Sequence, residues 1–230
     1  MRRRSLIPFA LAALAFAPAL AAQDTRPGIA VLPFENGGSY GQDKENFEAL
    51  QKGIPGMMIS ELGQNPAARV VDRDNIESLL KEQDLGKDGR VDAATAAKIG
   101  KLVGARYMIT GTFVDLYGHF RTDARIVDVE TSEILKTVKS EGKREELFKL
   151  IQTLSEKLMS ETKLPPLPKE VSQAVKARNV PTEALTLYSK ALLYQDRGDK
   201  TKAAEFFRKA IETFPNYAEA QEGLKKVSGG

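Results

Sequence analysis

The chain contains no cysteine, no tryptophan and a single histidine, His119. Without cysteine it has no disulfide, no thiolate metal ligand, no cysteine nucleophile and no N-terminal cysteine for a lipid anchor. With one histidine, a His-based zinc site or a Ser-His-Asp triad would depend on His119 alone. We therefore expect no catalytic residue, no cofactor and no metal site.

A strongly basic charge is also missing once the first residues are set aside. The 34 basic and 31 acidic residues give a formal net charge of +3, but the arginines at positions 2–4 precede a short apolar run at 6–17. Together with Ala19-Leu20-Ala21, a small-x-small cleavage pattern, they predict a signal peptide at residues 1–21. Removing three arginines leaves 31 basic against 31 acidic residues, so we expect no nucleic-acid partner.

The mature chain is expected to be exported, and to be periplasmic where the source has two membranes. No later stretch is long and apolar enough for a transmembrane helix, and without cysteine the chain is not expected to be a lipoprotein. The alternative for the leader is a retained membrane anchor, although its apolar run of about a dozen residues is short for a bilayer span.

Three prolines in four positions divide the remaining chain. Pro165, Pro166 and Pro168 cannot continue a helix and favour an extended connector. We therefore predict an α/β domain at residues 22–162, a proline-rich linker at 163–168 and a small all-helical module at 169–230.

Apolar periodicity predicts the elements of the α/β domain. Residues 28–34 are a continuous apolar run typical of a buried strand, and apolar residues at helical spacing follow at 47–62, with a kink expected at 53–56. Further strands are predicted at 68–71, 107–116, 121–129 and 133–140, and further helices after Asp72 or Asp74, after Asp92 and at 145–159. The fold class is a mixed sheet flanked by helices, with residues 28–34 at its centre.

Several segments of this domain match a known family in order and spacing. The matching pieces are Ile29-Ala30-Val31-Leu32-Pro33-Phe34-Glu35-Asn36, Val70-Val71-Asp72-Arg73 with Ile76, Leu79, Leu80 and Glu82, Ile99-Gly100, Gly104-Ala105-Arg106-Tyr107-Met108-Ile109-Thr110-Gly111-Thr112, and Ala124-Arg125-Ile126-Val127-Asp128-Val129-Glu130-Thr131-Ser132-Glu133-Ile134-Leu135. On these pieces, residues 28–161 resemble the CsgG family of curli assembly and transport. Related domains occur in LpoB-type activators of penicillin-binding proteins and in TolB-N-terminus-like domains. The resemblance implies a soluble periplasmic domain that binds envelope proteins, or itself in an oligomer.

Two features of that family have no counterpart here. CsgG is similar to a lipoprotein with an acylated N-terminal cysteine, which this chain lacks. CsgG also carries two long membrane-inserting hairpins, whereas only residues 113–123 separate two of the matching strands, and the strand at 134–135 leads through Gly142 directly into a helix. Two membrane-spanning strands need about 20 residues plus a turn. The resemblance therefore implies the partner-binding role and not the pore.

The C-terminal residues follow the spacing of a tetratricopeptide repeat (TPR), a unit of two antiparallel helices. In such a unit we expect small residues where the two helices cross and a glycine in a left-handed turn between them. We also expect a proline to start a third, capping helix at 218–227. Lys190 stands where leucine is usual. The signature residues are Leu187, Ala191, Tyr194, Gly198, Ala203, Phe207, Ala210 and Pro215.

One repeat buries little surface, and stable arrays need about three. The module must therefore stack with a helix at 168–178 and with the capping helix, or dock elsewhere. The inner side of its first helix carries Leu185, Tyr188, Leu192 and Gln195, at i, i+3, i+7 and i+10. We predict that these four residues bind a partner; the alternative is that they form core against the preceding helix.

The remaining patterns suit ordinary structural roles. The glycine-rich loop at 35–43 lacks the lysine and the glycine spacing of phosphate loops, and we expect a surface loop. Asp84, Asp88 and Asp92 miss the spacing of a calcium loop and suit turn and cap positions. We expect His119 at an exposed turn. The run at 72–74, Asp-Arg-Asp, either pairs locally, caps a helix or contacts a partner through its arginine.

The sequence thus favours an exported, non-enzymatic adaptor of a cell-envelope assembly or secretion system. One alternative is activation of a peptidoglycan synthase, which the likeness to LpoB-type activators implies. An alternative of another class is a small-ligand sensor or enzyme that uses the surface near residues 35–43. The identity of the partner and the oligomeric state do not follow from the sequence.

Overall fold

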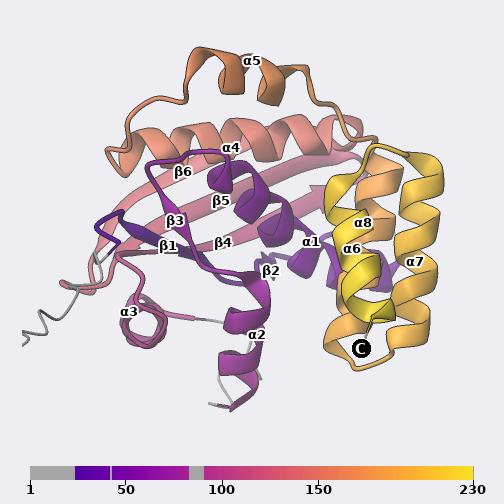
Figure 1. The fold of residues 1–230 in the computed structure, drawn as a ribbon, viewed down its shortest axis with the longest axis horizontal. Coiled ribbons are helices and arrows are strands. Elements are labelled where there is room, and N and C mark those ends of the chain that lie inside the picture. Colours follow the sequence, from indigo (N-terminus) through magenta and orange to yellow (C-terminus); the bar gives the residue numbers. More distant parts are fainter. Residues whose placement is uncertain (1–23, 42, 83–90, 230) are drawn as a thin grey trace, which may run out of the picture.

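A central sheet organises the computed structural model, which describes residues 24–41, 43–82 and 91–229. The predicted signal peptide, Asp84 and Asp88 lie outside these described residues. The sheet has six strands in the order β3-β1-β4-β5-β6, with β2 paired to β4 (Figure 1). The strands are β1 (Gly28–Val31), β2 (Glu35–Asn36), β3 (Arg69–Val70), β4 (Tyr107–Leu116), β5 (His119–Asp128) and β6 (Ile134–Lys143).

The sheet is mixed, as the sequence predicts. β1 pairs parallel with β3 and β4, β2 pairs parallel with β4, and β5 pairs antiparallel with both β4 and β6. A tight turn at Tyr117 and Gly118, with φ of 51° and 95°, joins β4 to β5. This turn agrees with the short connection inferred from the sequence.

The prediction of a loop over residues 35–43 is wrong at its start. Glu35 and Asn36 pair with Thr112 and Phe113 and form β2. These two polar residues show no apolar pattern that would predict a strand. They form one because their backbone groups find hydrogen-bond partners on β4. The rest of the loop is held by Asn36, whose Oδ1 accepts hydrogen bonds from the backbone N–H groups of Gly38 and Ser39.

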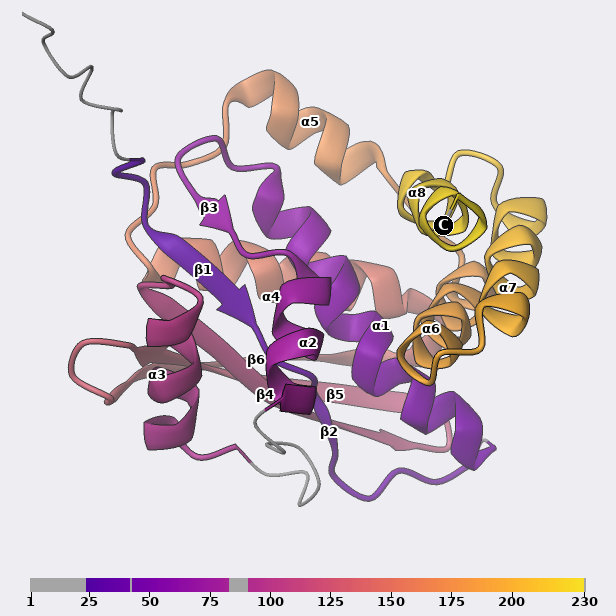
Figure 2. The same cartoon turned by 60° about the horizontal axis from the view of Figure 1, so that its bottom comes forward.

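Helices cover both faces of the sheet (Figure 2). Because side chains alternate along a strand, Ile29 and Val31 pack with α1 and α4, whereas Ala30 and Leu32 pack with α2 and α3. The helices are α1 (Lys44–Gly63), α2 (Arg73–Glu82), α3 (Ala93–Leu102), α4 (Leu147–Glu161), α5 (Lys169–Ala177), α6 (Thr182–Asp196), α7 (Lys200–Thr213) and α8 (Ala218–Ser228), with a short 3-10 helix η1 (Arg144–Glu146). None of the helices within the described ranges combines the length and the apolar character that crossing a membrane requires.

Two predicted helix caps are confirmed. The side chain of Asp92 accepts a hydrogen bond of 2.7 Å from the backbone N–H of Thr95, at the start of α3. Asp72 accepts one of 2.7 Å from the backbone N–H of Asp74, at the start of α2. Each bond satisfies a donor that has no partner within its helix.

Helix α1 continues through residues 53–56, where the sequence predicts a kink. Pro55 has no N–H, so the carbonyl of Gln51, four residues earlier, has no donor from within the helix. The backbone N–H of Phe34 donates to that carbonyl at 3.1 Å. The proline therefore frees a carbonyl that fastens the segment after β1 to the middle of α1.

The C-terminal helices pack directly against the rest of the structure and are not connected to it by the linker alone. α6 and α7 lie antiparallel with Ala191, Ala203 and Phe207 fully buried, and Gly198 turns between them with a φ of 81°. The buried residues of α6, α7 and α8 belong to the same hydrophobic cluster as α1 and α4. Residues 164–168 adopt neither helix nor strand. The division into domains and the assignment of a TPR stay predictions.

Two details of the helical module differ from the sequence prediction. α8 begins at Ala218, so Pro215 lies in the connection before the helix and not at its start. α5 lies over α4 (Figure 1), away from the other C-terminal helices, and its buried residue is Val175. The module thus docks on α1 instead of stacking on the helix that precedes it.

Gly111 of β4 has no room for a side chain, because an added Cβ would lie 2.2 Å from the ring of Phe34. Gly111→Ala displaces this fully buried ring, and we expect the free energy of unfolding to fall by about 1–3 kcal/mol, the usual cost of overpacking. Urea unfolding measures the change.

Gly63→Ala, at the end of α1, is the matched control, because no atom lies within 4 Å of an added Cβ there. We expect this variant to be neutral or more stable by up to about 1 kcal/mol. Equal stability of the two alanine variants would show that the Phe34 contact does not constrain Gly111.

Candidate functional site

The candidate site lies where α6 and α8 meet α1 and the start of α2. On its side toward α6, α1 carries small residues. An added Cβ on Gly53 would lie 1.7 Å from Oγ of Ser189, and one on Gly56 would lie 3.0 Å from Cδ1 of Leu192. A larger residue at Gly53 does not fit without displacing α6, because Cα of Ser189 would lie within 3.1 Å of its Cβ; at Gly56 the side-chain end of Leu192 would have to shift. The glycines that suggest a kink in the sequence therefore serve a close helix–helix contact.

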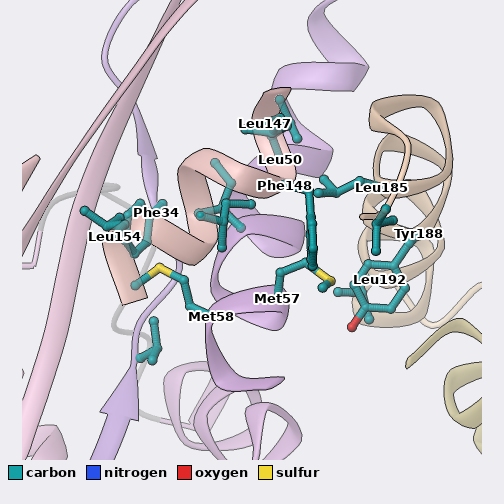
Figure 3. Packing of buried hydrophobic residues seen from close by; sticks show 14 of the residues in the cluster. Phe34, Leu50, Met57, Met58, Leu147, Phe148, Leu154, Leu185, Tyr188 and Leu192 are labelled. Atoms are coloured by element: carbon teal, nitrogen blue, oxygen red, sulfur yellow. The ribbon is translucent and has the colours of Figure 1, made fainter. Parts of the chain in front are cut away.

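The four predicted partner-binding residues lie on α6 at or beside this contact. Leu185 is fully buried, Tyr188 and Leu192 are 6% and 5% exposed, and Gln195 is half-buried. Figure 3 shows Leu185, Tyr188 and Leu192 on the side of α6 that faces α1 and Met57. Helix α1 thus covers the inner side of α6, where the sequence left a choice between a partner and the preceding helix. That these residues bind a partner stays a prediction.

Three of the four residues also reach solvent through a cavity of about 190 Å³. Tyr188, Leu192 and Gln195 form one wall of it, and the middle of α1, residues 72–74 and α8 form the others. We call this space the junction cavity. It brings the predicted residues of α6 together with Arg73, more than a hundred positions earlier in the chain.

Arg73 is the centre of a buried ion network beside the cavity. Its guanidinium donates hydrogen bonds of 3.0 and 2.9 Å to the carboxylate of Asp196, and both side chains are only about a tenth exposed. Lys52 of α1 lies 2.9 Å from Glu77 of α2 and 3.6 Å from Asp196 of α6. The network joins α1, α2 and α6.

Charge and hydrogen bonding keep Arg73 ionised despite its burial. Burial lowers the pKa of Arg73, but the hydrogen bonds and the charge of Asp196 outweigh burial and leave the pKa above its ordinary value. The sequence offered a structural role or a partner contact for this arginine, and the structure shows a structural one. Asp196, Lys52 and Glu77 were not identified from the sequence, because no local pattern connects them to Arg73.

A second polar cluster holds α8 against α1. Glu61 is 2% exposed; Arg178 donates to it at 3.2 Å, and Gln152 donates to it at 3.4 Å. Arg178 also pairs with Glu219 of α8, which accepts a further hydrogen bond from Ser60. Burial raises the pKa of Glu61 despite the opposing charge of Arg178.

The other candidates from the sequence lie elsewhere. His119 is exposed at the start of β5. A second cavity, of about 680 Å³, opens beside β2 and is lined by Glu35, Asn36, Gly37, Arg125 and other residues. In the part of the chain that the structure describes, no group of three or more His, Cys, Asp or Glu side chains is placed to hold a metal ion.

The family described as "Curli production assembly/transport component CsgG" matches residues 13–122 of the chain. The match contains Arg73 and strands β1 to β4, ends within β5, and confirms the resemblance found in the sequence. No curated protein matches the chain.

Several solved structures are similar to part of the chain. The LpoB C-terminal domain from Escherichia coli is 18% identical, with a TM-score of 0.38, and the match covers 51% of this chain and 83% of that one. TolB from Acinetobacter baumannii is 14% identical, with a TM-score of 0.40 and coverage of 61% and 29%. The PelC dodecamer from Paraburkholderia phytofirmans is 13% identical, with a TM-score of 0.35 and coverage of 61% and 91%.

Arg73→Gln removes the main cationic partner of the buried carboxylate of Asp196. Breaking a buried ion pair from one side is costly, and we expect the free energy of unfolding to fall by about 3 kcal/mol. Urea unfolding measures it. Arg121→Gln is the matched control, because Arg121 is half exposed and pairs with Asp123 at the surface. Exposed pairs contribute little, so a loss for Arg73→Gln no larger than the control's would contradict the role of the network.

Glu61→Gln tests the buried carboxyl group. Because the folded state raises the pKa of Glu61 above its ordinary 4.5, the folded chain binds this proton more tightly than the unfolded chain. The free energy of unfolding therefore falls as the pH rises through the folded pKa. Glutamine mimics the protonated form and removes this dependence.

We therefore expect the stability of Glu61→Gln relative to the unsubstituted chain to increase from about pH 4 to pH 7. Thermal unfolding at a series of pH values measures it. Glu212→Gln, an exposed change on α7, controls for the loss of one negative charge. A stability difference for Glu61→Gln that stays constant over this range would refute the raised pKa.

Proposed function

We propose that the chain is an exported, non-enzymatic adaptor that joins proteins of a cell-envelope assembly or secretion system. The observation that carries the proposal is the match of residues 13–122 to a family described by assembly and transport of curli. The predicted leader at residues 1–21 supports export to the periplasm. The C-terminal helices supply a second surface beside the CsgG-like part.

The packing of α6 suggests how such an adaptor works. The close contact at Gly53 and the Arg73 network hold α6 against the CsgG-like part, and the polar cluster around Glu61 holds α8 there. Because α1 covers most of the inner side of α6, a partner reaches that side at the junction cavity. We propose that Tyr188, Leu192 and Gln195 contact the partner there, while Leu185 supports α6 from the core.

A second candidate is a small-ligand sensor or enzyme. The cavity of about 680 Å³ beside β2 favours it, because Glu35, Asn36 and Arg125 bring polar groups to one space. Melting temperatures measured with nucleotides, sugars and metal ions distinguish the two candidates. A clear increase with one ligand class supports the sensor, and unchanged melting supports the adaptor.

A photo-reactive amino acid in place of Gln195 tests the adaptor in cells. We expect ultraviolet light to cross-link this variant to one specific envelope protein, because position 195 lies at the mouth of the junction cavity. The matched control carries the same amino acid in place of Thr137, which is exposed on β6. Mass spectrometry identifies the products. Cross-links that are absent at 195, or identical at both positions, would count against a partner at the cavity.

A further inference from the structure

We infer that the junction cavity binds a primary ammonium group on an aliphatic chain, either the lysine side chain of a partner protein or a free diamine. The inference rests on the proposed function only in taking this cavity as the contact site. It is carried by the hydroxyl of a largely buried tyrosine, which has no protein partner and opens on the cavity, by the charges around the opening and by the apolar lining.

The hydroxyl is that of Tyr188. The side chain is 6% exposed, and its hydroxyl oxygen makes no hydrogen bond to any residue in the described ranges. An added Cβ on Gly56 would lie 3.1 Å from this oxygen, and both residues line the cavity. The hydroxyl oxygen is open to the cavity and is not one of the fully buried atoms that lack a partner. A donor group that enters the cavity can therefore reach this oxygen.

The charges at the opening select a cation. The Nζ atom of Lys226 lies 3.7 Å from Asp72, 3.4 Å from Asp74 and 3.4 Å from Glu222. Asp74 also lies 3.3 Å from Arg73, whose guanidinium pairs with Asp196 outside the cavity, and Glu219 pairs with Arg178. The four carboxylates and two cations that line the cavity leave an excess of two negative charges. An opening of this sign attracts cations.

Lys226 shows that the opening suits an ammonium group. Burial lowers the pKa of Lys226, but the charges of Asp72, Asp74 and Glu222 outweigh burial and raise the pKa above its ordinary value. The side chain is 45% exposed, so it can swing aside or stay beside a second ammonium group. The carboxylates therefore stabilise the kind of charge that the inferred ligand carries.

The shape favours a lysine-like chain over a small inorganic ion. Ile59, Leu192 and Gly223 add apolar lining to the cavity that Tyr188 and the carboxylates share. The volume of about 190 Å³ is far more than a single water molecule needs. Lysine side chains pack their aliphatic stem on apolar surface and place the charged end among polar groups.

Calorimetric titration of the mature full chain tests the inference. The probes are 1,5-diaminopentane, for a free diamine, and acetyl-lysine methylamide, for a lysine within a protein. Acetyl-norleucine methylamide, which has an aliphatic chain and no charge, is the neutral control. We expect saturable binding of at least one amine and at least tenfold weaker binding of the norleucine compound. Tighter binding of the diamine indicates a free ligand, and tighter binding of the lysine compound indicates a partner's side chain.

Three variants locate the binding. Tyr188→Phe removes only the hydroxyl and Glu222→Gln removes one rim charge; we expect each to weaken amine binding at least fivefold. Tyr194→Phe is the matched control, because its hydroxyl bonds Glu45 outside the cavity, and it should bind amines as the unsubstituted chain does. Since Glu222 is exposed, its variant keeps the test valid even if Tyr188→Phe disturbs packing.

The inference is overturned if neither amine binds saturably, if the norleucine compound binds equally well, or if both cavity variants bind like the control. These outcomes are separate from the cross-linking result at position 195. Cross-linking without amine binding overturns the ligand chemistry and leaves the adaptor intact. Amine binding without cross-linking supports the cavity's chemistry and removes the support for a protein partner there.

Discussion

Helix α1 is buried on two sides, and the rest of the fold depends on this packing. One side lies against the sheet and α4, and the other lies against α6 (Figure 1). A helix needs cover wherever its surface is apolar, and α1 presents two such sides, one with large residues and one with glycines. Its buried apolar residues include Phe47, Leu50, Ile54, Met57, Met58 and Leu62. The sheet domain and the C-terminal helices therefore share one core.

The sequence predicted most of the fold, because most elements have local signals. The apolar run at 28–34, the caps at Asp72 and Asp92 and the alternation in β4 to β6 all depend on neighbouring residues. What it could not supply were contacts between distant segments. Gly53 and Gly56 suggest a break in a helix until Ser189 and Leu192 are placed against them. The pairing of Arg73 with Asp196 spans 123 positions and leaves no local pattern.

The candidate site also depends on contacts between distant segments, which the sequence could not predict. The spacing of Leu185, Tyr188, Leu192 and Gln195 identifies one face of a helix correctly, but spacing says nothing about what covers that face. The structure covers most of it with α1 and leaves the junction cavity at one end. The match to the CsgG family ends at residue 122, so α6 and α8, which complete the cavity, belong to the part of the chain outside that match.

The position of the Ser189–Gly53 contact in the chain affects how the molecule is made. Helix α1 forms from early residues, yet the surface that covers its glycine side comes more than a hundred residues later. Until that late segment arrives, the exposed apolar stripe of α1 is free to associate with other chains, a hazard that grows with the separation of native contacts. Such a chain completes its core only after its last helices have been synthesised. Truncation near the C-terminus would leave apolar surface of α1 exposed and prone to aggregation.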